Sequence, residues 1–238
     1  MFDIFTFKNS YPNPQLSPPQ LHPDLVPKLL LGYAHSEAPA SYLKISVRNT
    51  ILIALTKKKK MGRSRYRIHE EHNPYFITSS AINQIALFKN PKLVKIILDG
   101  LIFLQEERNI ELNAYVVMEN HIHIIAKGTN LGEHIRNFKS FSAHQIIKAL
   151  KKKKDHLSLN KLKQAKKSHK IESEHQVWEE SYHPKQLFTY KMVAQKMDYI
   201  HFNPVKRGYV DEPSHWRYSS ARNYDGRAGL IPITMFSG

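Results

Sequence analysis

Two histidines separated by one residue are the first candidates for chemistry in this chain. His121 and His123 lie in the run Asn-His-Ile-His-Ile, whose alternation of polar and apolar residues predicts a β-strand. Successive side chains of a strand point to opposite faces, so the two imidazoles would project from one face and the isoleucines from the other. Two imidazoles this close can bind one divalent metal ion. The simpler alternative is a pair of polar residues on the solvated face of an amphipathic strand.

A tyrosine in the run Asp-Tyr-Ile-His-Phe-Asn-Pro is the second candidate. On a helix, Tyr199 and Asn203 would be neighbours, because residues four apart share a face. A phenol ordinarily holds its proton at neutral pH, so Tyr199 could attack phosphorus only if another group polarised the phosphate. A metal ion can polarise it, and the amide oxygen of Asn203 could complete the metal's ligand set. The simpler alternative is a buried tyrosine on a core helix that Asn-Pro ends.

Composition favours a polyanionic partner and excludes several kinds of chemistry. The 238 residues include 36 Lys and Arg against 20 Asp and Glu, and a formal net charge of +16 favours nucleic acid or an acidic membrane surface as the partner. The chain has no cysteine, which excludes disulfides, thiolate ligands and cysteine nucleophiles and is compatible with the cytoplasm. Because we find neither a membrane-spanning apolar run nor a signal peptide, we expect a cytoplasmic protein without a membrane partner.

The candidate residues need a scaffold, and hydrophobic patterning predicts one from residue 75 onward. Strands are expected at 75–78, 113–118 and 121–126, the last two joined by a tight turn at Glu119-Asn120. Helices are expected from Pro91, over about 132–152 and over about 186–201. Pro204 is expected to bound the last helix, because the residue before proline avoids the helical region. Residues 216–220 are expected to form a loop that leads to a small C-terminal segment.

The first part of the chain has a different composition from the rest. Seven of the 13 prolines lie between Pro12 and Pro39, and no sustained periodicity is present before the lysines that precede Met61. Residues 1–60 therefore form either a Pro-rich, disordered extension or a segment outside the natural protein, with translation starting at Met61. Residues 61–238 are interpreted as one domain.

A lysine-rich tract follows the second predicted helix. Lys148 to Lys170 includes ten lysines and a single acidic residue, Asp155. Such a run is either a solvated helix face or loop, or a surface that contacts phosphates. The charge of the whole chain favours the second interpretation.

Together, these motifs resemble those of the REP-associated tyrosine transposases, a branch of the single-tyrosine HUH transposases. The resemblance covers about residues 66–224, and its second and fourth stretches are the most diagnostic. The matching stretches are Tyr75-Phe76-Ile77-Thr78, Ala114 to His123, Val177-Trp178, Tyr199 to Gly208 and Trp216-Arg217-Tyr218-Ser219-Ser220.

The resemblance implies an α+β fold, a ferredoxin-like antiparallel sheet with helices packed on it. It implies that His121, His123 and Asn203 bind Mg²⁺ or Mn²⁺, and that Tyr199 is the nucleophile that cuts single-stranded DNA. A 5′-phosphotyrosine link would form and release a 3′-hydroxyl, and a second 3′-hydroxyl would attack the link and rejoin the strands. It also implies recognition of DNA hairpins in palindromic repeats, by a monomer or a homodimer.

Basic side chains are expected to contact the DNA backbone, which gives affinity but little sequence information. The candidates are Arg136, Lys139, Lys151, Lys152, Lys206 and Arg207. Two positions depart from the family pattern. Glu119 stands where a proline often precedes Asn-His, and Glu179-Glu180 make the segment after Trp178 more acidic than usual, which puts DNA contacts there in doubt.

Two other functions remain open. A protein that binds DNA hairpins without strand transfer would keep the basic surface and need neither histidine. A replication initiator or relaxase, which are other HUH endonucleases, is less favoured, because the chain has one tyrosine in this context and no helicase-like region. Tyr115, Tyr182 and Tyr190 compete as nucleophiles, but Tyr115 is expected in the core, and Gln186 and Ala194 follow the other two at plus four.

Overall fold

The computed structural model describes residues 72–180 and 184–236, so the Pro-rich segment and the proposed start at Met61 lie outside the described residues. Its principal elements are β1 (Tyr75–Ser80), α2 (Pro91–Arg108), β2 (Glu111–Val117), β3 (His121–Lys127), α3 (Leu131–Lys152), α4 (His156–Ala165), β4 (Lys185–Gln186), α5 (Tyr190–Lys206) and α6 (Ala221–Tyr224). The strand order is β2-β3-β1-β4 and all neighbours are antiparallel. A βαββαβ chain with this order is ferredoxin-like, which confirms the predicted fold class.

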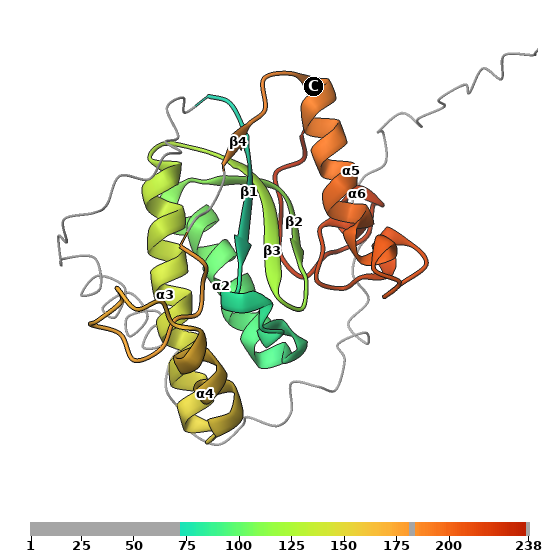
Figure 1. Ribbon diagram of the computed structural model, residues 1–238. Coiled ribbons are helices and arrows are strands. Elements are labelled where there is room, and N and C mark those ends of the chain that lie inside the picture. The colour runs from blue at the N-terminus through green and yellow to red at the C-terminus, as the bar shows by residue number, and fades with distance from the viewer. Residues whose placement is uncertain (1–71, 181–183, 237–238) are drawn as a thin grey trace, which may run out of the picture. The chain divides into compact units, whose positions relative to one another are not determined.

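Helices cover both faces of the sheet (Figure 1). On one face, Ile77, Ile122 and Ile124 pack in the larger core with apolar residues of α2 and α3. On the other face, a smaller core joins strand residues such as Ile125 to Val193 and Ile200 of α5. Strands β1, β2 and β3 are therefore buried on both sides, and the face of β3 that carries the histidines lies under α5.

Strand β2 contains a β-bulge. The pairing with β3 shifts register between Leu112 and Ala114, which leaves Asn113 as the extra residue. Leu112 belongs to the larger core and Ala114 to the smaller one, although residues two apart in a regular strand face the same side. The bulge therefore exchanges the two faces of β2 partway along the strand.

The helices that flank the sheet begin and end on local signals. Asn90 caps α2, since its side-chain oxygen accepts a hydrogen bond from the Lys92 backbone at 3.1 Å. Asn109 ends the same helix in the left-handed conformation, with φ 52°. The predicted start at Pro91 and the predicted range of α3 are confirmed, and part of the lysine tract forms α4. None of the described helices is both long and apolar enough to cross a membrane.

The prediction for the start of the tyrosine helix is wrong. The helix was expected from about residue 186, but α5 begins at Tyr190. Gln186 pairs instead with Tyr75 in the short strand β4. Thr189 then caps α5, because its hydroxyl accepts from the Met192 backbone at 3.2 Å.

The prediction that Pro204 bounds this helix is also wrong. Pro204 lies inside α5, which runs to Lys206 and therefore includes Asn203 in a helical turn. Proline lacks an N–H, but hydrogen bonds from Arg207 N to Asn203 O at 3.2 Å and from Gly208 N to Val205 O at 2.8 Å hold the turn that follows. The last turn therefore forms in spite of the proline.

The segment after α5 covers the free edge of β2. Residues 216–220 form the expected loop, which leads to the short helix α6. At this loop, the Val117 backbone donates to Tyr218 O at 2.8 Å and the Ser220 backbone donates to Tyr115 O at 3.0 Å. Farther along, the Thr234 backbone donates to Leu112 O at 2.9 Å. The C-terminal part of the chain is thus tied to the same sheet that carries the two histidines.

Candidate functional site

The two histidines lie side by side under α5. Their ring centroids are 4.7 Å apart, and the residues are only 6% and 5% exposed. This confirms that His121 and His123 share a face of β3. The alternative of a solvated strand face is wrong, because the smaller core and α5 cover this side of the sheet.

Each imidazole is held through its Nδ1 atom. Thr78 lies opposite His123 in the β1–β3 pairing, and its hydroxyl is 2.7 Å from His123 Nδ1. His121 Nδ1 is 2.6 Å from the side-chain oxygen of Asn120, which can only accept, so His121 donates there and keeps a lone pair on Nε2. His123 Nε2 is buried and has no hydrogen-bond partner within the described residues.

Burial keeps both imidazoles neutral. It lowers the pKa of His123 to about 3, with the neighbouring His121, Lys196 and Arg207 contributing in the same direction. Burial also lowers the pKa of His121, helped by Arg207 and opposed by Glu119. Neutral imidazole is the form that binds a metal, so neither histidine has to lose a proton first at neutral pH.

Tyr199 reaches this pair from α5. Its ring lies 5.2 Å from the His123 ring in an edge-to-face arrangement and 5.8 Å from Phe76. The residue is 39% exposed, so a substrate can reach it, whereas the histidines behind it are buried. The structure thus brings together the two motifs that the sequence analysis singled out.

Asn203 is placed one turn after Tyr199 and is buried. The described residues include no group of three His, Cys, Asp or Glu side chains that could hold a metal. A metal at the histidine pair would therefore take its remaining ligands from the Asn203 amide, substrate oxygens or water. The orphaned, buried Nε2 of His123 fits such a role, while Mg²⁺ in particular prefers oxygen ligands. The role of Asn203 as a ligand stays a prediction.

Two lysines lie over the ring of Tyr199, and an arginine follows at the end of the same helix. The Nζ atom of Lys196 lies 5.2 Å from the centre of the Tyr199 ring, and that of Lys206 lies 5.8 Å from it. Arg207 makes an ion pair with Glu119 at 2.7 Å, which ties the end of α5 to the turn between β2 and β3. The sequence analysis missed Lys196, although it lies one helical turn before Tyr199 and so shares its face.

The other predicted DNA contacts lie on α3, across the sheet from α5. Arg136 and Lys152 are exposed. Lys151 is 3.5 Å from Glu174, and Lys139 donates to the backbone carbonyl of Glu179 at 2.8 Å. Burial lowers the pKa of Lys139 to about 8. The six basic candidates are therefore divided between two faces of the sheet. Of the six, Lys206 lies over the Tyr199 ring, and Arg207 follows it at the end of α5.

A buried polar contact that the sequence analysis did not find holds α5 in place. His201 Nε2 lies 2.9 Å from the hydroxyl of Ser220, and this hydroxyl accepts from the Tyr115 backbone at 2.9 Å. Burial lowers the pKa of His201 to about 4, so the ring is neutral. Both His201 and Ser220 belong to the motif stretches quoted above, but their contact joins segments that the sequence alone does not place together.

The competing tyrosines lie elsewhere. Tyr115 is fully buried in the larger core, and burial raises its pKa to about 12. Tyr190 is exposed at the start of α5, where its ring stacks on Phe236 at 6.0 Å. Tyr182 lies outside the described residues. Among the described tyrosines, Tyr199 is the one whose ring contacts the histidine pair.

Comparison with known proteins gives matches in sequence and in structure. No protein-family model matches the chain. Over 130 residues, the chain is 28% identical to a Haemophilus influenzae protein named "Putative REP-associated tyrosine transposase", a match that covers 53% of this chain and 67% of that protein. A solved structure of a REP-associated tyrosine transposase bound to a REP hairpin is similar with a TM-score of 0.51 at 20% identity, covering 74% of this chain and 96% of that chain. In sequence and in fold, the chain thus resembles the REP-associated tyrosine transposases, as its motifs predicted.

Proposed function

We propose that this protein is a transposase-type enzyme that cuts single-stranded DNA beside a hairpin and joins the cut strand to another. The observation that carries the proposal is the contact between Tyr199 and the histidine pair. An exposed phenol lies 5.2 Å, ring to ring, from a buried, neutral imidazole whose Nε2 atom has no partner in the described part of the chain. The named relatives support the same activity.

The reaction begins when the phenol oxygen of Tyr199 attacks the phosphorus of a phosphodiester. A bond forms between this oxygen and phosphorus, the bond from phosphorus to the 3′ oxygen breaks, and a 5′-phosphotyrosine remains on the protein. The phenol proton is lost to solvent, and the departing oxygen gains a proton to become a 3′-hydroxyl. A second 3′-hydroxyl then attacks the same phosphorus and releases Tyr199, so no external energy source is needed.

The residues around Tyr199 supply position and charge. Lys196 and Lys206 lie close enough to the phenol ring to neutralise part of the charge of an arriving phosphate. The anchored helix α5 fixes the direction of the phenol, and holding the nucleophile in line with the phosphate removes much of the entropic cost. His121 and His123, with Asn203, would hold Mg²⁺ or Mn²⁺. When bound, such an ion polarises the scissile phosphate.

Capture of a covalent adduct tests this proposal. The protein is incubated with labelled hairpin oligonucleotides whose stems and single-stranded flanks are randomised, with Mg²⁺ or Mn²⁺, and the products are separated under denaturing conditions. We expect a labelled band at the size of the protein plus a DNA fragment. The band should disappear in Tyr199→Phe and persist in the matched control Tyr190→Phe, which removes an exposed hydroxyl from the same helix.

The outcomes separate the proposal from its rival. An adduct that is undiminished in Tyr199→Phe would refute the assignment of the nucleophile. A parent protein that binds hairpins tightly but forms no adduct with any member of the library would favour a DNA-binding protein without strand transfer. Direct measurement of Mn²⁺ binding, which should be lost in His123→Ala, tests the metal site independently of DNA cleavage.

A further inference from the structure

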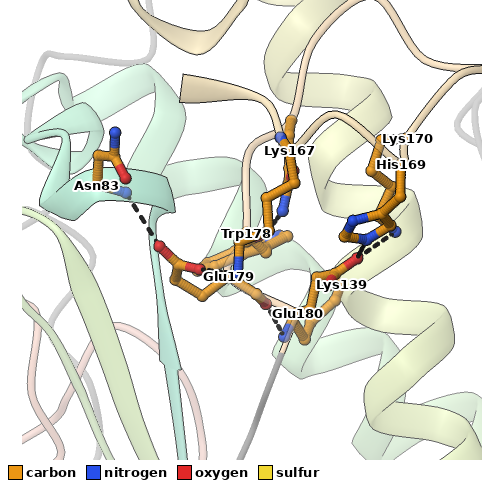
Figure 2. A network of polar contacts seen from close by, with 9 residues as sticks. Asn83, Lys139, Lys167, His169, Lys170, Trp178, Glu179 and Glu180 are labelled. Carbon is orange, nitrogen blue, oxygen red and sulfur yellow. Dashed lines mark hydrogen bonds and ion pairs between the residues drawn. The ribbon is translucent and has the colours of Figure 1, made fainter. Parts of the chain in front are cut away.

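The acidic pair after Trp178, which departs from the family pattern, lies within a group of basic side chains. Figure 2 shows Lys139, Lys167, His169 and Lys170 gathered around the segment that carries Glu179 and Glu180. We call these four basic residues the basic cluster. They come from α3 and from the chain that follows α4, so the fold brings together side chains that are far apart in the sequence.

Glu179 stabilises the fold through its side chain and its backbone. Its carboxylate accepts from the Asn83 backbone at 3.1 Å and pairs with Lys167 at 3.2 Å. Its own backbone N–H donates to Ser80 O at 2.9 Å, which attaches this segment to the end of β1. With contacts through both carboxylate oxygens and through its backbone, Glu179 fixes the segment in place.

Glu180 has a different set of contacts. One carboxylate oxygen, Oε1, lies 2.6 Å from His169 Nε2 and 3.2 Å from Lys170 Nζ. The side chains of Glu180, His169 and Lys170 are 36%, 60% and 43% exposed. The hydrogen bond from His169, followed by the contact with Lys170, lowers the pKa of Glu180. Its carboxylate is therefore an exposed anion seated among cations, and its contacts can be exchanged without opening the core.

The basic cluster attracts anions. Glu179 pairs with Lys167, Glu180 pairs with Lys170, and both carboxylates act on Lys139. The pKa of Lys139 depends on these neighbours. Burial lowers it most and Lys170 lowers it further, whereas Glu179 and Glu180 raise it. A phosphate matches a carboxylate in charge and in its ability to accept several hydrogen bonds, so it can replace Glu180.

The basic cluster lies at the same end of the sheet as the histidine pair. Glu179 is bonded to Ser80, and Ser80 lies opposite His121 in the β1–β3 pairing. Neighbouring strands are about 4.8 Å apart, so the backbone of Glu179 lies roughly 10 Å, two strand spacings, from that of His121. Because Lys139 lies on α3 and Tyr199 on α5, DNA held at Tyr199 would reach the cluster by passing around this end of the sheet.

We propose that Lys139, Lys167, His169 and Lys170 form a second binding site for a DNA backbone phosphate, and that the carboxylate of Glu180 occupies this site in the free protein. The inference rests on the proposed function, since it assigns a further contact to the same hairpin DNA. Glu180 then acts as an internal competitor. DNA must displace it before the basic cluster can contribute to affinity, and the acidic departure from the family pattern weakens the complex.

Hairpin binding by Glu180→Gln tests the inference. The dissociation constant of a fluorescein-labelled DNA hairpin with a single-stranded flank is measured by anisotropy over a range of salt concentrations, with the parent and the variant. Glutamine keeps the size of the side chain but removes its charge. We expect binding to tighten roughly threefold to tenfold, because DNA no longer breaks two exposed ion pairs. The slope of log Kd against log salt should also steepen, because in the parent salt weakens the internal ion pairs that DNA must break and so offsets part of its effect on DNA binding.

Two further variants make the test specific. Asp99→Asn removes an exposed carboxylate that pairs with Lys95 on α2, so it changes the net charge equally at a distant place and should leave affinity within twofold of the parent, about the effect of a surface charge. Lys170→Gln should weaken binding more in the Glu180→Gln background than in the parent, because Lys170 is masked only in the parent.

Each result has a defined meaning. Binding by Glu180→Gln that is equal to or weaker than that of the parent would overturn the inference, and so would an equal gain with Asp99→Asn. Lower thermal stability of Glu180→Gln without tighter binding would assign the ion pairs to the fold alone and also overturn it. A parent that binds no hairpin would overturn the proposed function itself, which is a different result from hairpin binding that Glu180→Gln leaves unchanged.

Discussion

Replacement of Ser220 by alanine tests whether the contact with His201 holds the tyrosine helix. The hydroxyl of Ser220 is the shared partner of two buried groups, the Nε2 atom of His201 at 2.9 Å and the backbone N–H of Tyr115 at 2.9 Å. It also lies 3.3 Å from Tyr115 O. A hydroxyl has one proton, so it donates either to His201 or to this carbonyl, and in the second case His201 donates to the hydroxyl.

The expected loss follows from these contacts. Alanine leaves His201 Nε2 and the Tyr115 N–H without a partner in a region where Ser220 is fully buried. A buried polar group that loses its partner costs about 1–3 kcal/mol, so the two together should lower the free energy of unfolding by about 2–6 kcal/mol. That is a large part of the ~5–15 kcal/mol that stabilises a typical domain.

Urea denaturation followed by circular dichroism measures this loss. Ser219→Ala is the matched control, because the neighbouring hydroxyl makes only a local bond, accepting from the Ala221 backbone at 3.1 Å, and should cost about 1 kcal/mol. Since His201 is two residues from Tyr199 on α5, Ser220→Ala should also slow adduct formation more than it weakens hairpin binding. A free energy of unfolding for Ser220→Ala equal to that of Ser219→Ala would refute the reasoning.

Three other predictions concern the site and the core. Thr78→Val removes the partner of His123 Nδ1 and should weaken Mn²⁺ binding about tenfold or more. The signal of free Mn²⁺ in electron paramagnetic resonance measures this affinity, and an unchanged affinity would contradict the prediction. Gly100→Ala places a methyl group 2.7 Å from the Phe138 ring and should cost about 1–3 kcal/mol of stability, which Phe138→Leu should partly restore if overpacking is the cause. Burial lowers the pKa of His201 in the folded state from 6.5 to about 4, so protonation of His201 destabilises the fold as the pH falls below 6.5. The free energy of unfolding should fall by about 3 kcal/mol between pH 6.5 and pH 4. Denaturant midpoints that stay constant over this range would contradict this prediction.

The geometry of the histidine pair could be predicted because it depends on one local rule. In any strand, His121 and His123 share a face, whatever the rest of the fold does. The sequence could not reveal that α5 covers the face of β3 that carries the histidines. The isoleucines of β3 predict a core on the opposite face, and the larger core is enough to explain them. The partner of His123 was missed for the same reason, since Thr78 meets it only through the β1–β3 register.

The errors in the tyrosine helix arise from competition between local and distant signals. Residues near Gln186 fit the start of a helix, but pairing with Tyr75 takes Gln186 into β4. Pro204 disfavours a helix locally, yet packing of α5 on the smaller core and the hydrogen bonds of its last turn keep the chain helical to Lys206. In each case, a tertiary contact overrides a modest local preference.

The hydrogen bonds along the outer side of β2 also limit how two copies of this protein could associate. An uncovered edge strand can accept a strand from another molecule, and many dimers extend a sheet in this way. Here residues 218–220 and Thr234 already use backbone groups of β2, so a second copy could add a strand there only by displacing part of its own chain. Among the described residues, helix surfaces and the side of the sheet near β4 would stay open to a homodimer that left this segment in place.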